Sequence, residues 1–382
     1  MKKETICFAG IILTAGLLLI LFCSGCQDET FVARIGCQND ILYRDTVEAA
    51  LSRMNNDRLS FRMEIVFDNY PAPSLANYSV QSAYAFCADP EILAVIGYGS
   101  SDAALAAAEI FNREEVVQIV PNATSPELAE TGPWTFKLLP DDRFQSRFLA
   151  GVAKEHYGAA ACAVIYQNND YGRELAGLFS RRLEEMGGAV TFQTAVGSGL
   201  EDSEVLEMYA SEIIEGDPDL LVFMCRPRQA GLIMDALDSR GAVFPLLGSD
   251  AMGSQFTIYE QPHLFRGMRV ALFYHHSFDT RGNQEFVATH RQLTGQFPDY
   301  TTALVYDAVF LLQQAFQAGA RTRKDVRQYL EDLGKNYPPF HGVCGKTVFD
   351  ENRACRRPLY LGVVKGKEIA LMEDPSGKLE EQ

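Results

Sequence analysis

Residues 95–128 read VIGYGSSDAALAAAEIFNREEVVQIVPNATSPEL, and this stretch decides the fold of the chain. An apolar, β-branched run at 93–96 stops at Gly97, and a small-residue segment at 102–111 with helical spacing of its apolar residues follows. That pattern predicts a strand, a turn and a helix. A second apolar run at 116–120 is closed by Pro121 and predicts the next strand.

Hydroxyl and amide groups lie just past both predicted strands. Ser100 and Ser101 occupy the first turn, and residues 122–125 read NATS after the second strand. In an open parallel sheet this edge is where ligands bind, because helix N-termini and free backbone N–H groups converge there and favour an anionic group. We therefore expect the two loops to hold one carboxylate between them.

The chain on both sides of this stretch alternates strands with helices. This alternation predicts α/β architecture, with parallel sheets covered on both faces by right-handed crossovers. Two such series follow one another, which predicts two doubly wound lobes. The predicted strands are 31–36, 61–67, 93–96, 116–120, 134–139, 161–166, a run from 189, 219–224 and 244–247, and the predicted helices are 45–55, 74–87, 102–111, 144–156, 171–186, 203–215 and 229–239.

The last third of the chain predicts additions to these two sheets rather than a third lobe. It contains a strand at 268–274, helices at 283–294, 301–318 and 323–333, a hairpin around Asp350 and a strand at 359–364. The residues from 371 to 382 are polar and are expected to be a frayed tail.

Length and charge limit the classes of function. A chain of 382 residues with 47% hydrophobic residues is long enough for two packed lobes. Its formal net charge of −16 comes without a basic stripe that could neutralise phosphates, so a nucleic-acid partner is not expected. Most of this charge is expected to be a solvated acidic surface.

The N-terminus carries a targeting pattern. Lys2 and Lys3 precede an apolar run at 6–22, followed by Ser-Gly-Cys at 24–26, which predicts a secretory signal at 1–25. Cys26 resembles the lipid acceptor of a bacterial lipoprotein box, although Cys23 stands where leucine is usual. An uncleaved signal anchor and a soluble secreted product are the alternatives.

Cysteine usage permits disulfides in an exported chain. Of nine cysteines, three lie in the N-terminal 26 residues, and six remain. Cys344 and Cys355 form the candidate disulfide, since the predicted hairpin around 349–352 could bring them opposite each other. Cys162 and Cys225 lie in or just after apolar runs and are expected to be small core residues.

Six short motifs occur in a fixed order along nearly all of the chain after the signal. They are Val-Ile-Gly with serines at 100 and 101, Pro-x-Ala-Thr-x-Pro-Glu-Leu at 121–128, Asp-Tyr-Gly at 170–172, Gly-Asp-Pro-Asp at 216–219, Gly-Ser-Asp at 248–250 and Tyr-Asp-Ala at 306–308. In this order and spacing the sequence resembles the type I periplasmic binding proteins, in particular the leucine/isoleucine/valine-binding-protein-like group that serves ABC importers.

The resemblance implies two lobes joined by three crossovers that close around a small ligand. Lobe one would comprise 30–139 and 275–336, and lobe two would comprise 140–274 and 337–370. No cofactor is implied.

The resemblance also implies roles for individual residues. Ser101 and the backbone around Ala123 and Thr124 would hold an α-carboxylate, with the Thr124 hydroxyl also near the ammonium. Tyr171 would close over the ligand from the second lobe, and Asp250 would pair with the ammonium. A zwitterion that leaves water needs both charges compensated. Helix capping for Ser101, a cap or turn role for Asp250 and surface packing for Tyr171 are the alternatives.

Two features depart from the family pattern. The loop after the first strand is short, because Gly-Cys-Gln-Asn-Asp at 36–40 leads almost at once to a helix. Arg226 stands at the end of a lobe-two strand, where an aromatic or small residue is common. An arginine facing the cleft would offer a bidentate fork to a second carboxylate or another anion. The alternative for Arg226 is a surface position beside Arg228.

Enzyme classes lack their motifs here. The sequence has no Gly-x-Ser-x-Gly elbow, no phosphate-binding Gly-x-x-x-x-Gly-Lys-Ser/Thr loop and no His-Glu-x-x-His zinc site. His275 and His276 are adjacent on a predicted strand and would point to opposite faces, so we expect no metal site there.

We therefore expect a lipid-anchored, non-enzymatic solute-binding protein that faces the periplasm or cell exterior. It would bind an amino acid or another small carboxylate and deliver it to an ABC permease in the membrane. The alternative is a lipoprotein of the same fold that regulates a partner, such as a sensor or a cell-wall synthase. Fold alone does not separate the two.

Overall fold

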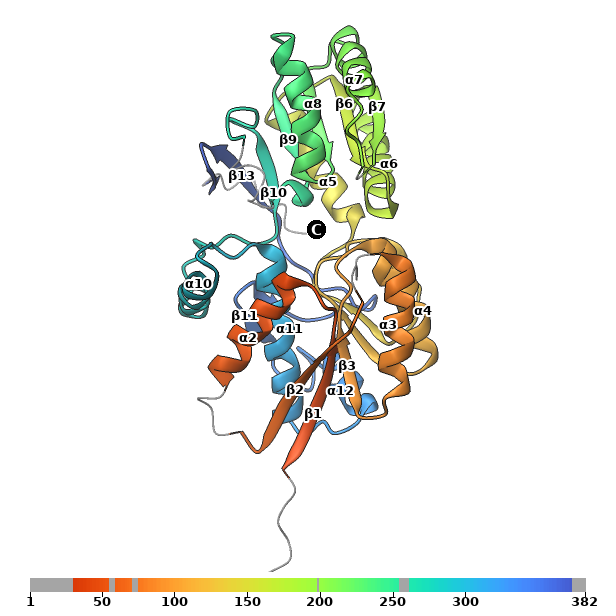
Figure 1. The fold of residues 1–382 in the computed structure, drawn as a ribbon, viewed down its shortest axis with the longest axis vertical. Coiled ribbons are helices and arrows are strands. Elements are labelled where there is room, and N and C mark those ends of the chain that lie inside the picture. The colour runs from red at the N-terminus through yellow and green to blue at the C-terminus, as the bar shows by residue number, and fades with distance from the viewer. Residues whose placement is uncertain (1–29, 55–58, 71–74, 198, 254–260, 373–382) are drawn as a thin grey trace, which may run out of the picture.

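The structure, a computed structural model, describes residues 30–54, 59–70, 75–197, 199–253 and 261–372. These residues form two lobes, each built on one main sheet, and Figure 1 shows one lobe above the other. Within these ranges no helix is both long and apolar enough to cross a membrane. The predicted signal peptide, Cys26 and nearly all of the polar tail lie outside the described residues.

The first lobe contains a five-stranded sheet in the order β2-β1-β3-β4-β5, and all four strand pairs are parallel. Its elements are β1 (Phe31–Cys37), α2 (Ile41–Met54), β2 (Phe61–Phe67), α3 (Ala76–Ala88), β3 (Ile92–Ile96), α4 (Ser101–Arg113), β4 (Val117–Val120), the 3₁₀ helix η1 (Pro126–Ala129) and β5 (Thr135–Lys137).

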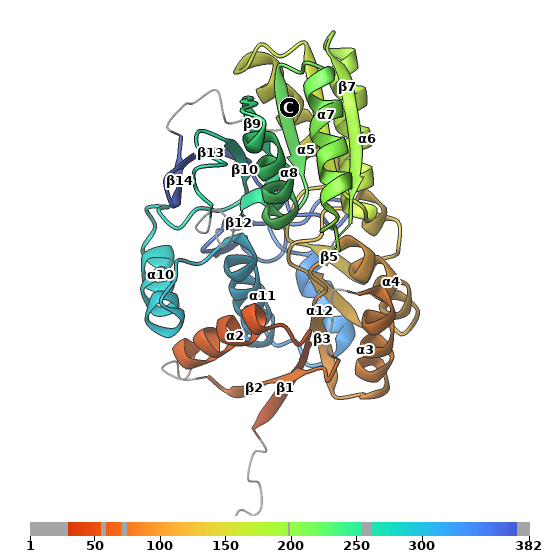
Figure 2. The ribbon, with the colours of Figure 1, turned by 45° about the horizontal axis from the view of Figure 1, so that its top comes forward.

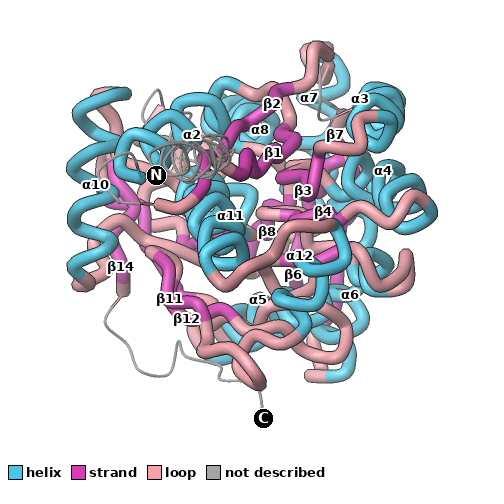
Figure 3. Tube along the Cα trace, turned by 90° about the horizontal axis from the view of Figure 1, so that it is seen from below, coloured by secondary structure: helices cyan, strands magenta, loops and turns pink. Residues whose placement is uncertain are grey.

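Both faces of the first sheet are covered. All five residues of β3 are buried, as expected for a central parallel strand. Helices α3 and α4 pack together on one face, where Phe86 and Phe111 join the cluster around Val95. Helices α2 and α11 (Tyr300–Gln317) pack together on the other face, and Figure 3 shows helices on both sides of the strands.

The second lobe contains a seven-stranded sheet in the order β14-β13-β10-β9-β8-β6-β7. Its elements are α5 (Asp142–Glu155), β6 (Ala161–Gln167), α6 (Asp170–Glu185), β7 (Ala189–Val196), α7 (Ser203–Glu215), β8 (Leu220–Met224), α8 (Pro227–Ser239), β9 (Leu246–Gly248), the 3₁₀ helix η2 (Asp250–Gly253), β10 (Arg269–Leu272), β13 (Tyr360–Lys365) and β14 (Glu368–Leu371). The β10–β13 and β13–β14 pairs are antiparallel, so this sheet is mixed. The sequence analysis did not predict β14.

Three connections pass between the lobes: from β5 to α5, from β10 to α10 (Arg281–Thr294), and from β12 (Gly345–Thr347) to β13. After α10 the chain forms α11 and α12 (Arg323–Glu331), and β11 (Phe340–Gly342) then pairs with β12 as a short hairpin. Figures 1 and 2 show these connections in the middle of the molecule.

A buried carboxylate fixes the β11–β12 hairpin to the first lobe. Asp307 on α11 accepts hydrogen bonds from the backbone N–H groups of Val343, at 2.7 Å, and Cys344, at 3.0 Å. A Cβ on Gly342 would lie 2.1 Å from Asp307 Oδ1, so only glycine fits at that position. Burial raises the pKa of Asp307 to about 6, while the positive charge of Arg357 opposes this rise.

Arg357 links two of the three connections. Its side chain is buried, and it donates to the carbonyl oxygen of Leu138 at 2.7 Å and to that of Cys344 at 2.6 Å. Leu138 follows β5, while Arg357 lies between β12 and β13. The two chain segments therefore cross the lobe boundary as one hydrogen-bonded unit.

Residues 343–357, which the sequence assigned to the second lobe, contact the first lobe. Lys137 in β5 donates its N–H to Arg353 and accepts from Cys355 N, so this segment extends the edge of the first sheet. Residues 360–365 join the second sheet instead. The lobe boundaries expected from the sequence, with 337–370 in the second lobe, stay a prediction. These contacts favour a passage of the chain from the first lobe to the second near Arg357.

The predicted Cys344–Cys355 disulfide is not formed in the structure. Every described cysteine is a free thiol, and both members of this pair are buried. Cys344 lies in the β11–β12 turn, and its backbone N–H donates to the Asp307 carboxylate. Cys355 Sγ instead contacts the Lys346 carbonyl oxygen at 3.8 Å. The turn predicted around Asp350 is present as a bridge between Phe349 and Cys355. Cys162 and Cys225 are fully buried, as predicted.

We predict that Asp307→Ala lowers the free energy of unfolding by about 3 kcal/mol, because it leaves two buried amides and the Arg357 charge without their acceptor. Asp307→Asn, which retains one acceptor oxygen, should lose less. Denaturant unfolding of both variants measures the effect, with Asp238→Ala on the exposed side of α8 as the control. Equal stability of Asp307→Ala and the control would contradict this role.

Candidate functional site

The predicted ligand loops of the first lobe lie side by side, because β3 and β4 are neighbours in the sheet. Asn122 after β4 donates to the Gly99 carbonyl oxygen at 3.1 Å and accepts from the Tyr43 hydroxyl at 3.0 Å. Gln38, after β1, accepts from Gly99 N at 2.8 Å. The short loop after β1 thus supports the loops that follow β3 and β4.

Ser100 and Ser101 have different roles at the start of α4. Ser100 is the N-cap, and its hydroxyl accepts from Ala103 N at 3.3 Å. Ser101 lies in the first turn with its side chain 2% exposed, and its Oγ has no hydrogen-bond partner among the described residues. A buried hydroxyl without a partner is costly, so Ser101 Oγ is available to a ligand.

The loop after β4 presents a second such hydroxyl. Ala123 and Thr124 are buried, and Thr124 Oγ1 likewise has no partner at good hydrogen-bond geometry within the described part of the chain, although it lies close enough to Asp142 to lower the pKa of that carboxyl. The Thr124 carbonyl oxygen accepts from Asp142 N at 3.0 Å, which joins this loop to the start of α5. Both hydroxyls therefore lie where the first lobe meets the second.

The second lobe contributes Tyr171 and Asp250. The Tyr171 hydroxyl, from the first turn of α6, donates to Asp250 Oδ1 at 2.6 Å and lies 2.9 Å from Ser249 Oγ. Asp250 follows β9 and is 3% exposed, and its N–H donates to Gln145 Oε1 at 2.9 Å. The loops after β6 and β9 are thus joined by a phenol–carboxylate hydrogen bond.

Residues that the sequence analysis did not select complete this arrangement. Gln145 Nε2 donates to Asp142 Oδ1 at 3.3 Å, and Asp142 Oδ2 is buried without a partner in the described residues. Tyr300, at the start of α11, directs its hydroxyl to Asp250 and lowers the pKa of that carboxyl.

We call Ser101, Thr124, Asp142, Tyr171, Asp250 and Tyr300 the interlobe site. Asp142 could have been found, because it follows the predicted strand at 134–139.

Electrostatics in the interlobe site favour a cation. Burial raises the pKa of Asp250, although hydrogen bonds from Tyr171, Gln145 and Tyr300 oppose the rise. Burial raises the pKa of Asp142 still further, and the negative charge of Asp250 adds to the effect. Neither carboxyl has an ion pair with a described residue. A cation placed between the two would offset their repulsion and desolvation.

The lobes are in contact around the interlobe site, and Figures 1 and 2 show α6 next to α4. The Ser125 hydroxyl donates to Glu174 Oε2 at 2.9 Å, and Asp170 N donates to Asp102 Oδ1 at 3.2 Å. Each contact joins a residue of the first lobe to the start of α6. Such contacts join the two lobes directly.

Arg226 is exposed and is the N-cap of α8, although its side chain makes no capping hydrogen bond. It follows β8, which lies between β6 and β9 in the sheet. Burial raises the pKa of Tyr300, as do the Asp250 and Asp299 charges, whereas the Arg226 charge lowers it. The structure thus places Arg226 at the edge of the interlobe site.

The predicted arrangement of His275 and His276 is wrong, because β10 ends at Leu272 and both residues lie in the loop beyond it. Their ring centroids are 4.2 Å apart. His275 Nδ1 bonds Ser277 Oγ at 2.7 Å, and Nε2 bonds the Ile369 carbonyl oxygen at 2.8 Å. In the part of the chain that the structure describes, no group of three or more His, Cys, Asp or Glu side chains could hold a metal ion.

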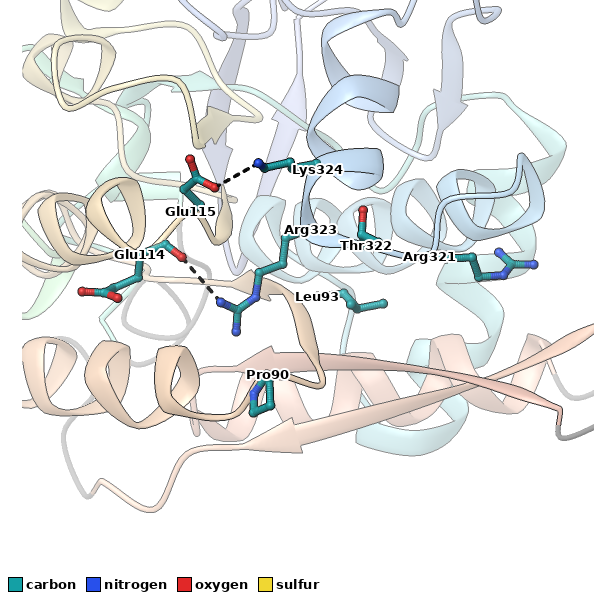
Figure 4. Close-up of a pocket in the computed structure, with 8 residues that line it drawn as sticks. All are labelled: Pro90, Leu93, Glu114, Glu115, Arg321, Thr322, Arg323 and Lys324. Atoms are coloured by element: carbon teal, nitrogen blue, oxygen red, sulfur yellow. Dashed lines mark hydrogen bonds and ion pairs between the residues drawn. The ribbon is translucent and has the colours of Figure 1, made fainter.

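A separate recess of about 450 Å³ lies at the opposite end of the first lobe, near the start of β3 (Figure 4). Arg323 crosses it and donates to the carbonyl oxygens of Ile92 and Asp89, at 2.9 and 2.8 Å. Lys324 pairs with Glu115 at 3.6 Å. The cationic groups of this recess are occupied by protein acceptors, so the interlobe site remains the candidate.

Two α/β lobes, joined by three connections and meeting over a buried polar site, define a protein of the hinged ligand-binding class. Residues 43–362 match the family model described as the receptor family ligand binding region, and the chain belongs to this family. This is a ligand-binding family rather than a family of enzymes.

Known proteins are consistent with this assignment. The chain is 25% identical over 269 residues to the Leu/Ile/Val-binding protein homolog 1 of Brucella abortus (strain 2308), covering 70% of each chain. It is similar to the leucine-binding protein LivK of Thermotoga maritima MSB8, with a TM-score of 0.79 and 21% identity over 90% of this chain and 99% of that one. A solute-binding protein of Rhodopseudomonas palustris BisB5 in complex with 3,4-dihydroxybenzoic acid matches with a TM-score of 0.78 and 17% identity, covering 90% and 99%. The predicted type I periplasmic binding protein fold is confirmed.

We predict that Asp142→Asn stabilises the ligand-free protein by at least about 1 kcal/mol at pH 7.5, since one unit of pKa difference equals about 1.4 kcal/mol. A carboxyl whose pKa is raised on folding contributes stability below its unfolded pKa and loses that contribution as the pH rises through the folded pKa. The gain should therefore be larger at pH 7.5 than at pH 4.5.

Denaturant unfolding at both pH values measures this difference. Asp141→Asn is the matched control, because Asp141 is the N-cap of α5 and asparagine caps a helix equally well. An Asp142→Asn variant that is less stable than the wild type at pH 7.5 would contradict the prediction. It would show that other groups of the protein already balance the negative charge of Asp142.

Proposed function

We propose that this chain is the substrate-binding protein of an ABC importer and that it binds an amino acid between its lobes. One observation carries the proposal: the interlobe site combines unpartnered hydroxyls with buried carboxyls. Ser101 Oγ and Thr124 Oγ1, on the first lobe, are donors for an α-carboxylate. Asp250 and Asp142, both buried, are acceptors for an ammonium group.

Position supports the same assignment of charges. Ser101 lies in the first turn of α4, where free backbone N–H groups and the helix dipole favour an anion. Asp250 and Asp142 approach from the other side of the lobe boundary. A zwitterion placed across that boundary would have each charge opposite its complement.

The buried carboxyls distinguish between ligand classes found in proteins of this fold. The Rhodopseudomonas palustris relative was solved with 3,4-dihydroxybenzoic acid, which has a carboxylate and no ammonium. The Desulfitobacterium hafniense relative was solved with leucine, which has both. Asp142 and Asp250 would repel a benzoate and would attract an amino acid, so they favour the second class.

Closure would couple binding to the hinge. Ligand contacts from both lobes at once stabilise the closed arrangement relative to an open one. The Ser125–Glu174 and Asp102–Asp170 contacts lie beside the interlobe site and would form on closure. A closed, loaded protein is the form that a permease would recognise.

Isothermal titration calorimetry with matched compounds tests the proposal. The panel contains amino acids, the amines that lack their carboxylate, the hydroxy acids that lack their ammonium, and benzoates. Compounds with both charged groups should bind more tightly than either truncated set. A benzoate or hydroxy acid that binds as tightly as the parent amino acid would overturn the proposal.

We predict that Asp250→Ala weakens binding of the amino acid found in that panel by at least about a hundredfold, because it removes a buried partner of the ammonium. Thr124→Ala should weaken binding by about tenfold through one lost hydrogen bond to a charged group. Circular dichroism should show both variants folded, and Asp238→Ala should bind like the wild type. Unchanged affinity in both site variants would contradict the site.

We also propose that Cys26, which lies outside the described residues, carries a lipid anchor after removal of residues 1–25. The Cys26→Ser variant should move from the membrane pellet to the soluble fraction when expressed in a bacterium that processes lipoproteins. Mass spectrometry of the wild-type N-terminus checks the modification. An unmodified Cys26 in membrane-bound protein would favour an uncleaved anchor.

A further inference from the structure

Arg226 occupies the middle of the ligand-facing edge of the second sheet. The sheet order β9-β8-β6 places the loop after β8 between the loops that carry Asp250 and Tyr171. Arg226 begins this middle loop, two residues after the last residue of β8. The topology therefore brings its side chain to the same edge as two members of the interlobe site.

The charge of Arg226 also reaches the opposite lobe. Tyr300 belongs to α11 of the first lobe, and Arg226 lowers the pKa of its hydroxyl. Tyr300 in turn donates toward Asp250. The Arg226 charge therefore acts across the lobe boundary on a tyrosine that itself bonds Asp250.

Arg226 differs from its neighbour Arg228 in its contacts. Arg228 is exposed and pairs with Glu201, in the loop between β7 and α7. Arg226 is exposed as well, but its side chain makes no ion pair or hydrogen bond with any residue that the structure describes. Its guanidinium fork is therefore available to an external acceptor.

We propose that Arg226 binds a second anionic group on the ligand, so that the preferred ligands are amino acids with an acidic side chain. This inference rests on the proposed function, because the α-carboxylate and ammonium would be held by the groups already described. A side-chain carboxylate would then be the one charge left without a partner, and Arg226 would supply a bidentate one.

The balance of charge supports this assignment. The first-lobe donors Ser101 and Thr124 are neutral hydroxyls, and Asp250 carries the opposite charge to the ammonium. The side-chain carboxylate of an acidic ligand would lie near Asp142 and Asp250. Both would repel it if no cationic group stood beside it. Arg226 lies on the same edge and offsets that repulsion, whereas a neutral side chain would leave its guanidinium unused.

Calorimetric titration of the full mature chain with isosteric pairs tests the inference. Glutamate is compared with glutamine, and aspartate with asparagine, for the wild type, Arg226→Gln and Arg228→Gln. In the wild type the acidic member of a pair should bind at least about tenfold more tightly than its amide. Arg226→Gln should weaken binding of the acidic member by about tenfold to a hundredfold and leave the amide unchanged. Arg228→Gln should match the wild type.

The outcomes separate this inference from the proposed function. Binding of neutral amino acids with no preference for acidic ones, or equal loss of both pair members in Arg226→Gln, overturns the role of Arg226 and leaves the amino-acid site in place. Failure of every amino acid to bind the wild type overturns both. High salt should weaken binding of the acidic ligand more than binding of its amide, because salt screens the charge of an exposed side chain such as Arg226.

Discussion

The direction of parallel strands is the constraint on which this molecule depends. All strands of the first sheet run the same way, so their carboxyl ends and the loops that follow them share one edge. The central strands of the second sheet do likewise. The two edges face each other across the lobe boundary, with Ser101 and Thr124 on the first edge and Tyr171 and Asp250 on the second. Residues far apart in the chain come to one boundary because each lies in the loop after a strand or at the start of the helix that follows that loop.

Burial of acidic groups at this boundary opposes folding. Asp142 and Asp250 lie in a region from which water is excluded, and burial raises the pKa of both. Their cost is offset by the packing of the lobes and by the hydrogen bonds that Gln145 donates to Asp142 and Tyr171 donates to Asp250. A cationic ligand group would recover part of that cost, which couples lobe closure to the occupied state.

The hinge region is rigid on one side of that boundary. Asp307, Arg357 and the β11–β12 hairpin fasten the third connection to the first lobe, and Arg357 also bonds Leu138 on the first connection. Any bending between the lobes that leaves these bonds intact would occur beyond them. The direct contacts between the lobes, such as Ser125 with Glu174, are the ones that opening would break.

The sequence by itself determined the alternation of strands and helices and the loops that hold Ser101, Thr124, Tyr171 and Asp250, because hydrophobic periodicity and turn residues are local signals. It did not predict the mixed sheet, the free thiols of Cys344 and Cys355, or the pairing of Asp142 with Gln145. Only the tertiary structure decided these features, and it also set Tyr300 against Asp250. The physical reason is that each depends on which segments, distant in sequence, exclude water from one another, and burial of that kind has no local pattern in the chain.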